Sequence, residues 1–536
     1  MMQYLSLYNS QFASIRELNR IYVDKTDLVY ELAKPEAGRW YFLSRPRRFG
    51  KSLLISTFAE LFRNGLKNFA GLKIADLWRD QTCKVLHLDF SLMSTARSAK
   101  EFLERFDSLM TVACRQAELD YERMEELDVQ DRLGLLLGSL PNSSLAILID
   151  EYDAPLVANM NDPDSFADMC RGYSAIFQQI KSFQGAVRFF FMTGVVKISL
   201  TGIFSGFNNI QDISLKRKYG TLLGYTEKEV ETYFSEYLDN AADVRGMSRR
   251  EVLDRLRENY DGYCFDEAVS THVYAPWSVM SFLSAPEDGF KCYWYDSAGK
   301  PSVLVNFLKR HGVFDFKRLD EEVRLEMSEL GAVHGLSDMN ADAILFQSGY
   351  LTFKKVIGNY ALLDYPNKEV RRSMEDVCRS LIIGNDIMNR ICFDGIIKPL
   401  RMGEADVVVR FFNELMSGAD YTDAQQISSE GICRFCIYLS LRGLGLEPRP
   451  EMHNAYGRSD LELDVGNKRW VFEFKFATKK FEVDKKLAEA AHQMEARHYG
   501  EARLGSRELI RVALVYCAET RRFSSQKLPQ SVRIPE

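Results

Sequence analysis

The chain has 536 residues, and at roughly 150 residues per domain this length predicts three or four domains, each with a core of its own. Hydrophobic residues make up 46% and charged residues 27% of the sequence, which is typical of globular proteins in water. No run of about 18 apolar residues could cross a membrane, and the N-terminus lacks the pattern of an export signal. We therefore expect a cytoplasmic protein with no membrane partner.

The formal net charge is −6, so any contact with nucleic acid must come from local basic patches. One candidate patch comprises Arg45, Arg47, Arg48 and Lys51. The other comprises Lys468, Arg469, Lys475, Lys479, Lys480, Lys485 and Lys486. Charge runs are commonly solvated faces, so each patch gains interest only where it coincides with a candidate site.

The ten cysteines are scattered, as expected in a reducing compartment. Cys433 and Cys436 form the one close pair, in an apolar stretch of helical character with no second pair at metal-ligand spacing. Zinc binding and core packing are the two alternatives, and the pattern favours packing.

Residues 40–62, WYFLSRPRRFGKSLLISTFAELF, read as a strand, a loop and a helix. The loop ends in Gly50, Lys51 and Ser52. A phosphate-binding loop needs these three types in this order: no side chain near the phosphates, an ammonium for the β and γ oxygens, and a hydroxyl for Mg²⁺. We assign these residues and Arg48 to a site for ATP and Mg²⁺.

The glycine that usually opens such a loop, five places before Gly50, is replaced by Arg45. The tripeptide alone is therefore weak evidence, and a helix preceded by a basic loop is the alternative.

A second segment favours the nucleotide site. Residues 145–151, LAILIDE, form a buried type of strand that ends in Asp150 and Glu151. In a parallel sheet the carboxyl ends of the strands share one edge, where Asp150 would hold Mg²⁺ and Glu151 would act as general base for water. A surface acidic cluster that caps a core strand is the alternative.

Residues 84–90 and 187–194 are two more apolar runs that fit the same sheet. Thr193 lies at the end of the second run and is a candidate sensor of the γ-phosphate, although threonine is common as a turn or cap residue.

The middle of the chain begins with Thr226 and Glu229, which are spaced as a capping box, and continues as amphipathic helices to about residue 340. Residues 343–365 then predict a helix stopped at Ser348 and Gly349, and a hairpin around 358–359. Helices followed by a hairpin suggest a winged helix, which would either touch DNA or serve as a rigid connector. Its basic residues are few: Lys354, Lys355 and Lys368.

Residues 459–476 read as two alternating strands joined by a two-residue turn at 466–467. If Val465 pairs with Lys468, then Asp464 faces Arg469 and Asp460 faces Glu473. The alternation places Lys475 on the same face as Glu473.

Two facing carboxylates repel each other, and a divalent cation between them turns that penalty into a binding site. Lys475 is placed to orient water or to stabilise charge in the transition state. We therefore predict metal-dependent catalysis by Asp460, Glu473 and Lys475, with a half-exposed mixed polar hairpin as the alternative.

The chain resembles the AAA-ATPase-like proteins of anaerobic bacteria that end in a PD-(D/E)xK nuclease-like domain. The resemblance rests on YVDKTDLVYEL (22–32), FLSRPRRFGKSLL (42–54), LIDEYDAPL (148–156), TGIFSGFNNIQDIS (201–214), FQSGYLTF (346–353) and the hairpin. That family replaces the first glycine of the loop in the same way.

The C-terminal order of a helix at 425–441, the hairpin, a helix at 485–499 and a strand at 509–517 resembles the PD-(D/E)xK fold. Asp460, Glu473 and Lys475 match its signature, with Ser459 in place of the usual proline. The resemblance implies accessory roles for Glu430, as a further metal ligand, and for Gln493.

We expect an α/β chain in three parts: a P-loop ATPase domain at 1–225, a helical lid and winged-helix-like connector at 226–400, and a nuclease-like domain at 401–536. The leading hypothesis is an ATPase whose nucleotide state gates a Mg²⁺-dependent nuclease, acting on DNA rather than RNA, in defence against foreign DNA.

Two alternatives stay open: a nucleotide-controlled DNA-binding or scaffold protein with an inactive nuclease fold, and an ATPase switch that acts on a protein partner. A homo-oligomer is possible, and Arg217 is a guess for an arginine finger.

Overall fold

The computed structural model describes residues 3–121, 127–198, 210–294, 322–330, 340–382, 394–417, 429–501 and 504–529. The chain forms two compact units. The first contains the described residues up to 294 together with Glu322–Arg371, and the second contains those from Arg372 onward. The predicted division into three parts, at 1–225, 226–400 and 401–536, is finer than these two units and remains a prediction.

The first unit is built on a five-stranded parallel sheet with the order β2-β3-β4-β1-β5. Its strands are β1 (Trp40–Ser44), β2 (Lys84–Asp89), β3 (Leu145–Asp150), β4 (Val187–Gly194) and β5 (Gln211–Asp212). The three runs predicted as strands at 84–90, 145–151 and 187–194 are confirmed. Their nearly continuous apolar character follows from burial on both faces of a parallel sheet.

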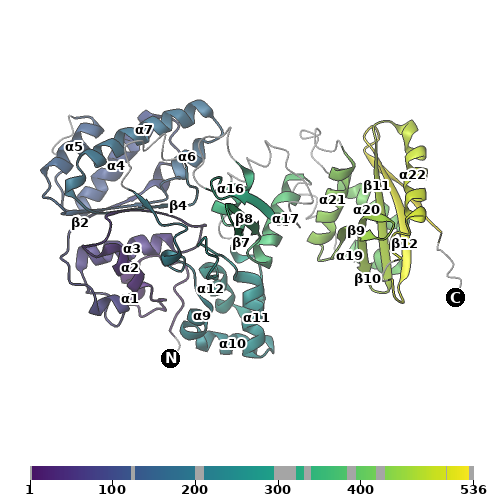
Figure 1. Cartoon of the computed structure of the whole chain (residues 1–536), viewed down its shortest axis with the longest axis horizontal. Coiled ribbons are helices and arrows are strands. Elements are labelled where there is room, and N and C mark those ends of the chain that lie inside the picture. The colour runs from purple at the N-terminus through teal and green to yellow at the C-terminus, as the bar shows by residue number, and fades with distance from the viewer. Residues whose placement is uncertain are drawn as a thin grey trace. The chain divides into compact units, whose positions relative to one another are not determined.

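Helices cover both faces of this sheet (Figure 1). One face carries α1 (Phe12–Glu17), α2 (Thr26–Ala33) and α3 (Lys51–Asn64), and the other carries α4 (Ala99–Gln116), α5 (Val129–Ser139), α6 (Ala154–Asn159) and α7 (Pro163–Ser182). Phe58 and Phe62 of α3 pack against Phe189 of β4 with ring centroids 4.9 Å apart in both pairs. The strand, loop and helix predicted over residues 40–62 are therefore confirmed.

A group of helices follows the sheet: α9 (Glu227–Tyr233), α10 (Ser235–Arg245), α11 (Arg249–Tyr260) and α12 (Pro276–Ser284). The predicted capping box is present, since Thr226 accepts from the Glu229 backbone and Glu229 accepts from the Thr226 backbone. Leu5, Ile21 and Val23 pack into the core of this group, so the N-terminal segment joins the sheet region to the helices.

The predicted hairpin is confirmed as β7 (Thr352–Ile357) and β8 (Tyr360–Asp364), and β6 (Val323–Glu326) pairs with the far side of β8. The helix before it, α16 (Ala341–Gln347), ends at Ser348, and Gly349 has φ +90°. A side chain at residue 349 would lie 2.5 Å from Pro46, so glycine is also required there for close packing. The unit boundary falls within α17 (Lys368–Ile382).

The second unit contains a five-stranded mixed sheet with the order β13-β12-β11-β10-β9. Its strands are β9 (Arg449–Asn454), β10 (Gly457–Val465), β11 (Lys468–Ala477), β12 (Glu508–Cys517) and β13 (Arg522–Lys527). Its helices are α19 (Asp394–Met402), α20 (Ala405–Ser417), α21 (Glu430–Gly443) and α22 (Val483–Ala496). The predicted helix, hairpin, helix and strand are confirmed, except that residues 425–428 lie outside the described part.

Both faces of this sheet are covered. Val471 packs with Met494 of α22 on one face, and Phe472 meets Phe412 of α20 on the other, with ring centroids 5.4 Å apart. The half-exposed hairpin that the sequence allowed is therefore wrong, because helices cover the strands on both sides.

The predicted register is confirmed over five pairs, from Val465 with Lys468 to Leu461 with Phe472. Cys433 and Cys436 are buried in α21, which agrees with core packing. Every described helix is too short or too polar to span a membrane.

Candidate functional sites

The first candidate site is the loop between β1 and α3. Gly50 caps α3 with φ +94°, and Arg48 has φ +64°, so the loop turns through two left-handed residues. Glycine adopts this conformation without a steric penalty. The turn places the first residues of α3 in the lining of a cavity of about 520 Å³. The first N–H groups of a helix have no partner within the helix and can bind a ligand.

Arg45, which replaces the usual glycine, is buried and serves as a brace. Its guanidinium donates to the carbonyl oxygens of Ser214 at 2.6 Å and Tyr219 at 3.1 Å, and it lies 4.1 Å from the ring of Phe265. Burial lowers the pKa of Arg45 to about 9. The basic patch predicted at 45–51 is thus wrong as a single surface, because Arg45 and Lys51 are buried and only Arg47 and Arg48 are exposed.

Lys51 is also buried, and the loop itself supplies its partners. The ammonium donates to the carbonyl oxygens of Arg45 at 3.0 Å and Pro46 at 2.9 Å. Burial lowers the pKa of Lys51, while the nearby carboxylates Asp150, Asp153 and Glu151 raise it. Ser52 is exposed and lines the cavity beside Lys51. An anion in the cavity would therefore meet a lysine that is poorly hydrated.

The two predicted carboxylates lie at the end of β3, as expected. Asp150 is 4% exposed, and its Oδ1 accepts from the Glu151 backbone at 3.0 Å. Glu151 has φ +48° and lines the cavity with Lys51 and Ser52. Burial is the main cause that raises the pKa of Glu151. The structure therefore brings Glu151 to the same cavity as the loop, and a carboxyl with a raised pKa is suited to accept a proton.

Thr193 is fully buried, and its hydroxyl donates to the Leu43 carbonyl of the neighbouring strand at 2.8 Å. This bond links β4 to β1, and a role toward the γ-phosphate remains a prediction. Arg217 is exposed in a short 3-10 helix at Arg217–Tyr219, and its role as an arginine finger also remains a prediction.

Sequence reasoning missed Tyr152 and Asp153, which follow the two carboxylates. The buried Asp153 carboxylate accepts from the backbone N–H groups of Val195 at 3.0 Å and Val196 at 2.7 Å. The Tyr152 hydroxyl donates to the Val196 carbonyl at 2.9 Å. These bonds fix the chain just after β4 against the turn that carries Glu151. The third carboxylate in LIDEYD was the available signal.

The cavity is lined by both charged and aromatic residues. The loop and Glu151 supply the charged groups. The aromatic and apolar groups are Tyr8, Tyr22, Tyr225, Trp277 and Met280, and the Arg48 guanidinium lies 4.5 Å from the centre of the Trp277 ring. Charged groups and aromatic rings within one cavity match the two chemical halves of a nucleotide.

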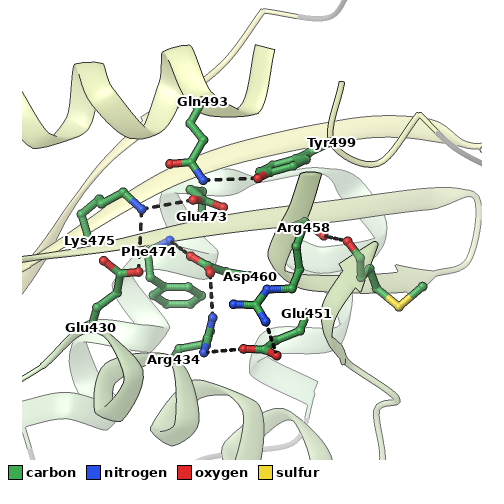
Figure 2. A network of polar contacts seen from close by, with 12 residues as sticks. Glu430, Arg434, Glu451, Arg458, Asp460, Glu473, Phe474, Lys475, Gln493 and Tyr499 are labelled. Atoms are coloured by element: carbon green, nitrogen blue, oxygen red, sulfur yellow. Dashed lines mark hydrogen bonds and ion pairs between the residues drawn. The ribbon is translucent and has the colours of Figure 1, made fainter. Parts of the chain in front are cut away.

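The second candidate site lies in the second unit, where α21, β10 and β11 meet (Figure 2). Lys475 Nζ lies 3.1 Å from Glu473 Oε1 and 3.7 Å from Glu430 Oε1. Asp460 Oδ2 accepts from the Phe474 backbone at 2.8 Å. The structure thus brings together Glu430, Asp460, Glu473 and Lys475, four of the residues predicted for this site.

Glu473 is 1% exposed, and its Oε2 has no hydrogen-bond partner among the described residues. Its pKa is raised to about 7, first by burial and then by the charge of Asp460. The pKa of Glu430 is also raised by burial, whereas the carboxylates around Lys475 raise the pKa of that lysine against its burial. In this site the ionised form of Glu473 is therefore destabilised relative to the protonated form.

Arg434, which the sequence reading missed, binds Asp460 from α21. Its Nη1 lies 2.7 Å from Asp460 Oδ1, and its Nη2 lies 3.2 Å from Glu451 Oε1. Arg434 follows Glu430 by one helical turn, so the i, i+4 spacing from a predicted site residue was the available signal.

The remaining predicted residues lie nearby. Gln493 reaches from α22 toward Glu473 and donates to the Tyr499 hydroxyl at 3.2 Å (Figure 2). Ser459, in place of the usual proline, is buried and donates to Glu462 Oε1 at 2.9 Å. Neither of these hydrogen bonds involves Asp460 or Glu473, so the roles of the two side chains stay predictions.

The second basic patch is wrong as one surface. Lys468 pairs with Glu508, Arg469 with Asp464, and Lys486 donates to the Phe476 carbonyl. Lys468 and Arg469 are successive residues of β11, so their side chains point to opposite faces of the sheet. Of the whole patch, only Lys479, Lys480 and Lys485 are exposed.

Within the described ranges, no three His, Cys, Asp or Glu side chains group closely enough to hold a metal ion by themselves. Mg²⁺ needs fewer protein ligands, because it retains several waters and is commonly held by one or two carboxylates. Asp460 and Glu473 supply hard oxygen donors, and the unpartnered Oε2 of Glu473 is an acceptor that a cation would satisfy. These residues therefore fit Mg²⁺.

The fold and the two sites define a protein with a P-loop type of ATPase domain and a nuclease-type domain. Residues 9–204 match the family model described as a predicted AAA-ATPase, and residues 428–526 match the PD-(D/E)XK nuclease superfamily model. The chain belongs to the AAA-ATPase-like family and carries a PD-(D/E)XK nuclease superfamily domain at its C-terminus.

A relative from Azotobacter chroococcum mcd 1, described as an uncharacterized protein in the vnfD 5′ region, is 31% identical over 481 residues, or 87% of each chain. The solved structure of the ORC2 protein of Aeropyrum pernix, in ADPNP and ADP complexes, covers 71% of this chain and 95% of its own. Its identity is 11% and its TM-score 0.29, a likeness too low to carry an argument.

Proposed function

We propose that this protein binds and hydrolyses ATP in its N-terminal cavity and cleaves phosphodiester bonds in DNA, with the help of Mg²⁺, at Asp460, Glu473 and Lys475. The observation that carries the proposal is Glu473: a buried carboxyl, with one oxygen unpartnered among the described residues, beside a second carboxyl and a lysine. Burying such a group without a partner costs free energy, and the cost is tolerated where a ligand completes the site.

In the nuclease-type site, Asp460 and Glu473 would hold Mg²⁺, with Glu430 as a further ligand. Bound Mg²⁺ would supply Lewis-acid polarisation of the phosphate and a lower pKa for water. Lys475, held between Glu473 and Glu430, would place a positive charge where the transition state becomes negative.

In the N-terminal cavity, the backbone of Gly50 and the ammonium of Lys51 would contact phosphates, and Arg48 would add a second cation. Ser52 and Asp150 would hold Mg²⁺, Glu151 would activate water, and Thr193 would sense the γ-phosphate. The support for this half is the shared cavity of the loop and Glu151.

We further propose that the nucleotide state controls cleavage, and that the protein acts in the cytoplasm against foreign DNA, as a homo-oligomer if ATP is hydrolysed between subunits. This part rests on the presence of an ATPase-like and a nuclease-type domain in one chain.

The test is cleavage of linear and circular DNA by the full chain with Mg²⁺ or Mn²⁺, with and without ATP. Lys51→Ala and Glu473→Ala are measured beside it. We expect cleavage that disappears in Glu473→Ala and changes with ATP in the wild type but not in Lys51→Ala. Cleavage that is indifferent to ATP would contradict nucleotide control alone.

One observation favours the second candidate, a nucleotide-controlled scaffold with an inactive nuclease fold. Arg434 already binds Asp460 Oδ1 at 2.7 Å, so a guanidinium stands where a metal ligand is expected to be open. Absence of cleavage, together with intact ATP and DNA binding, would support this candidate.

A further inference from the structure

An exposed aromatic and basic rim adjoins the carboxylate site of the second unit. We define this hairpin rim as Tyr456, Arg458, Arg497 and His498. Tyr456 is 67% exposed in the turn between β9 and β10, and its ring centroid lies 5.3 Å from that of His498. A single exposed ring is common on protein surfaces, so the groups around Tyr456 decide whether it belongs to a binding surface.

The turn that carries Tyr456 is held in place. Asn454 Oδ1 accepts from the backbone N–H groups of Tyr456 and Gly457, both at 2.8 Å. Asn454 Nδ2 donates to the Arg497 carbonyl at 2.8 Å, which fixes the turn to the end of α22. A side chain at residue 457 would lie 2.7 Å from Arg497 Cδ, so the turn and the helix end pack closely. The ring is therefore presented on a rigid support, which lowers the entropy cost of binding.

The rim is continuous with the candidate catalytic carboxylates. Arg458 precedes Asp460 by two residues on β10, which places both on one face about 7 Å apart along the strand. Arg458 is 46% exposed and contacts Glu451, which also binds Arg434 (Figure 2). On the other side, Arg497 donates to the Tyr499 hydroxyl at 3.3 Å, the same hydroxyl that Gln493 contacts.

The charge of the rim is mainly positive. The acidic groups beside its exposed part are Glu451, paired with Arg434 and Arg458, and Glu501, paired with His498 and Arg511. Asp460 and Glu473 lie at its inner end, where Mg²⁺ would offset their charge. Arg458 and Arg497 thus flank a stacking surface, and Lys475 lies beyond them in the site. Alternating cations and aromatic rings suit a nucleic-acid strand, in which phosphates and bases alternate.

We propose that the hairpin rim binds an unpaired strand of nucleic acid, with Tyr456 and His498 stacking on a base and Arg458 and Arg497 contacting the phosphates that lead to Asp460. An exposed ring gains most from a base whose face is open, and in a duplex both faces are already covered by neighbouring bases. This inference rests on the proposed nuclease function and names its substrate as single-stranded or frayed nucleic acid.

Phe481 provides a matched control. It is 83% exposed in the 3-10 helix Lys480–Glu482, directly after Lys480. That helix precedes α22, whereas His498 follows it, so about 20 Å of helix separates the two aromatic groups. A general loss of exposed aromatic surface would affect both variants equally.

The test is fluorescence anisotropy of the full chain in EDTA, where binding is measured without cleavage. The probes are fluorescein-labelled 20-nucleotide oligo-dT, the corresponding oligo-U, and a 20-base-pair duplex. We expect oligo-dT to bind more tightly than the duplex, and Tyr456→Ala to weaken oligo-dT binding by about 5- to 50-fold. Phe481→Ala should stay within about twofold, and Arg458→Ala should lower the slope of log affinity against log salt by about 1.

Equal effects of Tyr456→Ala and Phe481→Ala, or a preference for the duplex that neither variant changes, would overturn the inference. Tighter and Tyr456-dependent binding of oligo-U would support the surface and identify RNA as its ligand. Tyr456-dependent binding without Mg²⁺-dependent cleavage would support the surface and contradict the nuclease function. Cleavage with no change in binding by Tyr456→Ala would contradict the surface alone.

Discussion

The N-terminal cavity and the carboxylate site each bury an ionisable side chain, but the two side chains differ in their hydrogen-bond partners. The Lys51 ammonium donates hydrogen bonds to two carbonyl oxygens of its own loop, so the buried cation has partners inside the protein. Glu473 has one oxygen toward Lys475 and one that accepts no hydrogen bond from any described residue. Burial disfavours the charged form in both cases, lowering the pKa of Lys51 and raising that of Glu473 to about 7.

The loop thus satisfies Lys51 with its own carbonyl oxygens, whereas the carboxylate site leaves one oxygen of Glu473 without a hydrogen bond from the described residues. An anion that binds Lys51 must compete with the carbonyl oxygens of Arg45 and Pro46 for the ammonium. The carboxylate site gains a missing interaction when a cation arrives.

Lys475→Met should lower the rate of Mg²⁺-dependent DNA cleavage by about 10²- to 10³-fold, because it removes a preplaced charge from the developing negative transition state. ATP affinity should not change. Single-turnover cleavage assays measure the rate, with Lys485→Met, at a side chain 83% exposed, as the control. A rate in Lys475→Met equal to that of the control would remove Lys475 from the chemistry.

Arg45→Gly restores the glycine of the common loop, yet it should lower the free energy of unfolding of the first unit by about 3 kcal/mol. The substitution leaves the carbonyls of Ser214 and Tyr219 without their donor and opens a cavity beside Phe265. Chemical denaturation measures the loss. Arg47→Gly, in the same loop but exposed, should cost about 1 kcal/mol or less. A stabilised Arg45→Gly variant would show that the brace is dispensable.

Lys51→Ala should weaken ATP binding by about 10- to 100-fold, since it removes a charge-assisted contact to phosphate. Isothermal titration calorimetry measures the affinity, with the exposed Lys67→Ala as the control. DNA cleavage without nucleotide should be the same in both variants. Retention of wild-type affinity would contradict the assignment of the cavity to ATP.

Glu473→Gln should stabilise the metal-free protein relative to wild type at pH 8, by about 2 kcal/mol, and much less at pH 5. The folded protein raises the pKa of Glu473 from 4.5 to about 7, so it holds the proton more tightly than the unfolded chain. The stability gained from that proton is complete below the unfolded pKa and is lost as the pH rises through about 7. Urea denaturation at both pH values measures the difference.

The exposed Glu489→Gln is the control for this pH effect, and its stability should follow the wild type at both pH values. Parallel profiles for Glu473→Gln and wild type would mean that the burial of Glu473 carries no penalty. Added Mg²⁺ should reduce the advantage of Glu473→Gln at pH 8, because a cation favours the ionised carboxyl.

Much of the fold could be predicted because its signals are local. The apolar run before Asp150, the glycine of the loop and the two-residue turn at 466–467 each depend on neighbours in the sequence. The register of β10 and β11 follows from the turn alone, since each pair fixes the next. The same register places Glu473 and Lys475 on one face of β11.

The rest depends on contacts between distant residues. A charged side chain such as Arg45 is expected in solvent, and only the arrival of residues 214, 219 and 265 around it explains its burial. The role of Arg434 also depends on distant residues, because its partners Asp460 and Glu451 lie on other elements. The division of basic runs into separate ion pairs likewise follows from packing that the sequence does not display.

Asp460 has a structural role in the sheet, at the end of the pairing between β10 and β11. The paired register stops at Leu461 with Phe472, and beyond it the N–H of Phe474 is taken up by the Asp460 carboxylate at 2.8 Å. The side chain thus does the work of a missing backbone carbonyl at a place where two strands part. Asp460→Ala removes the acceptor of the Phe474 N–H as well as a metal ligand, whereas Asp460→Asn keeps an acceptor oxygen for that N–H. The two substitutions therefore separate the structural role of Asp460 in the sheet from its role in metal binding.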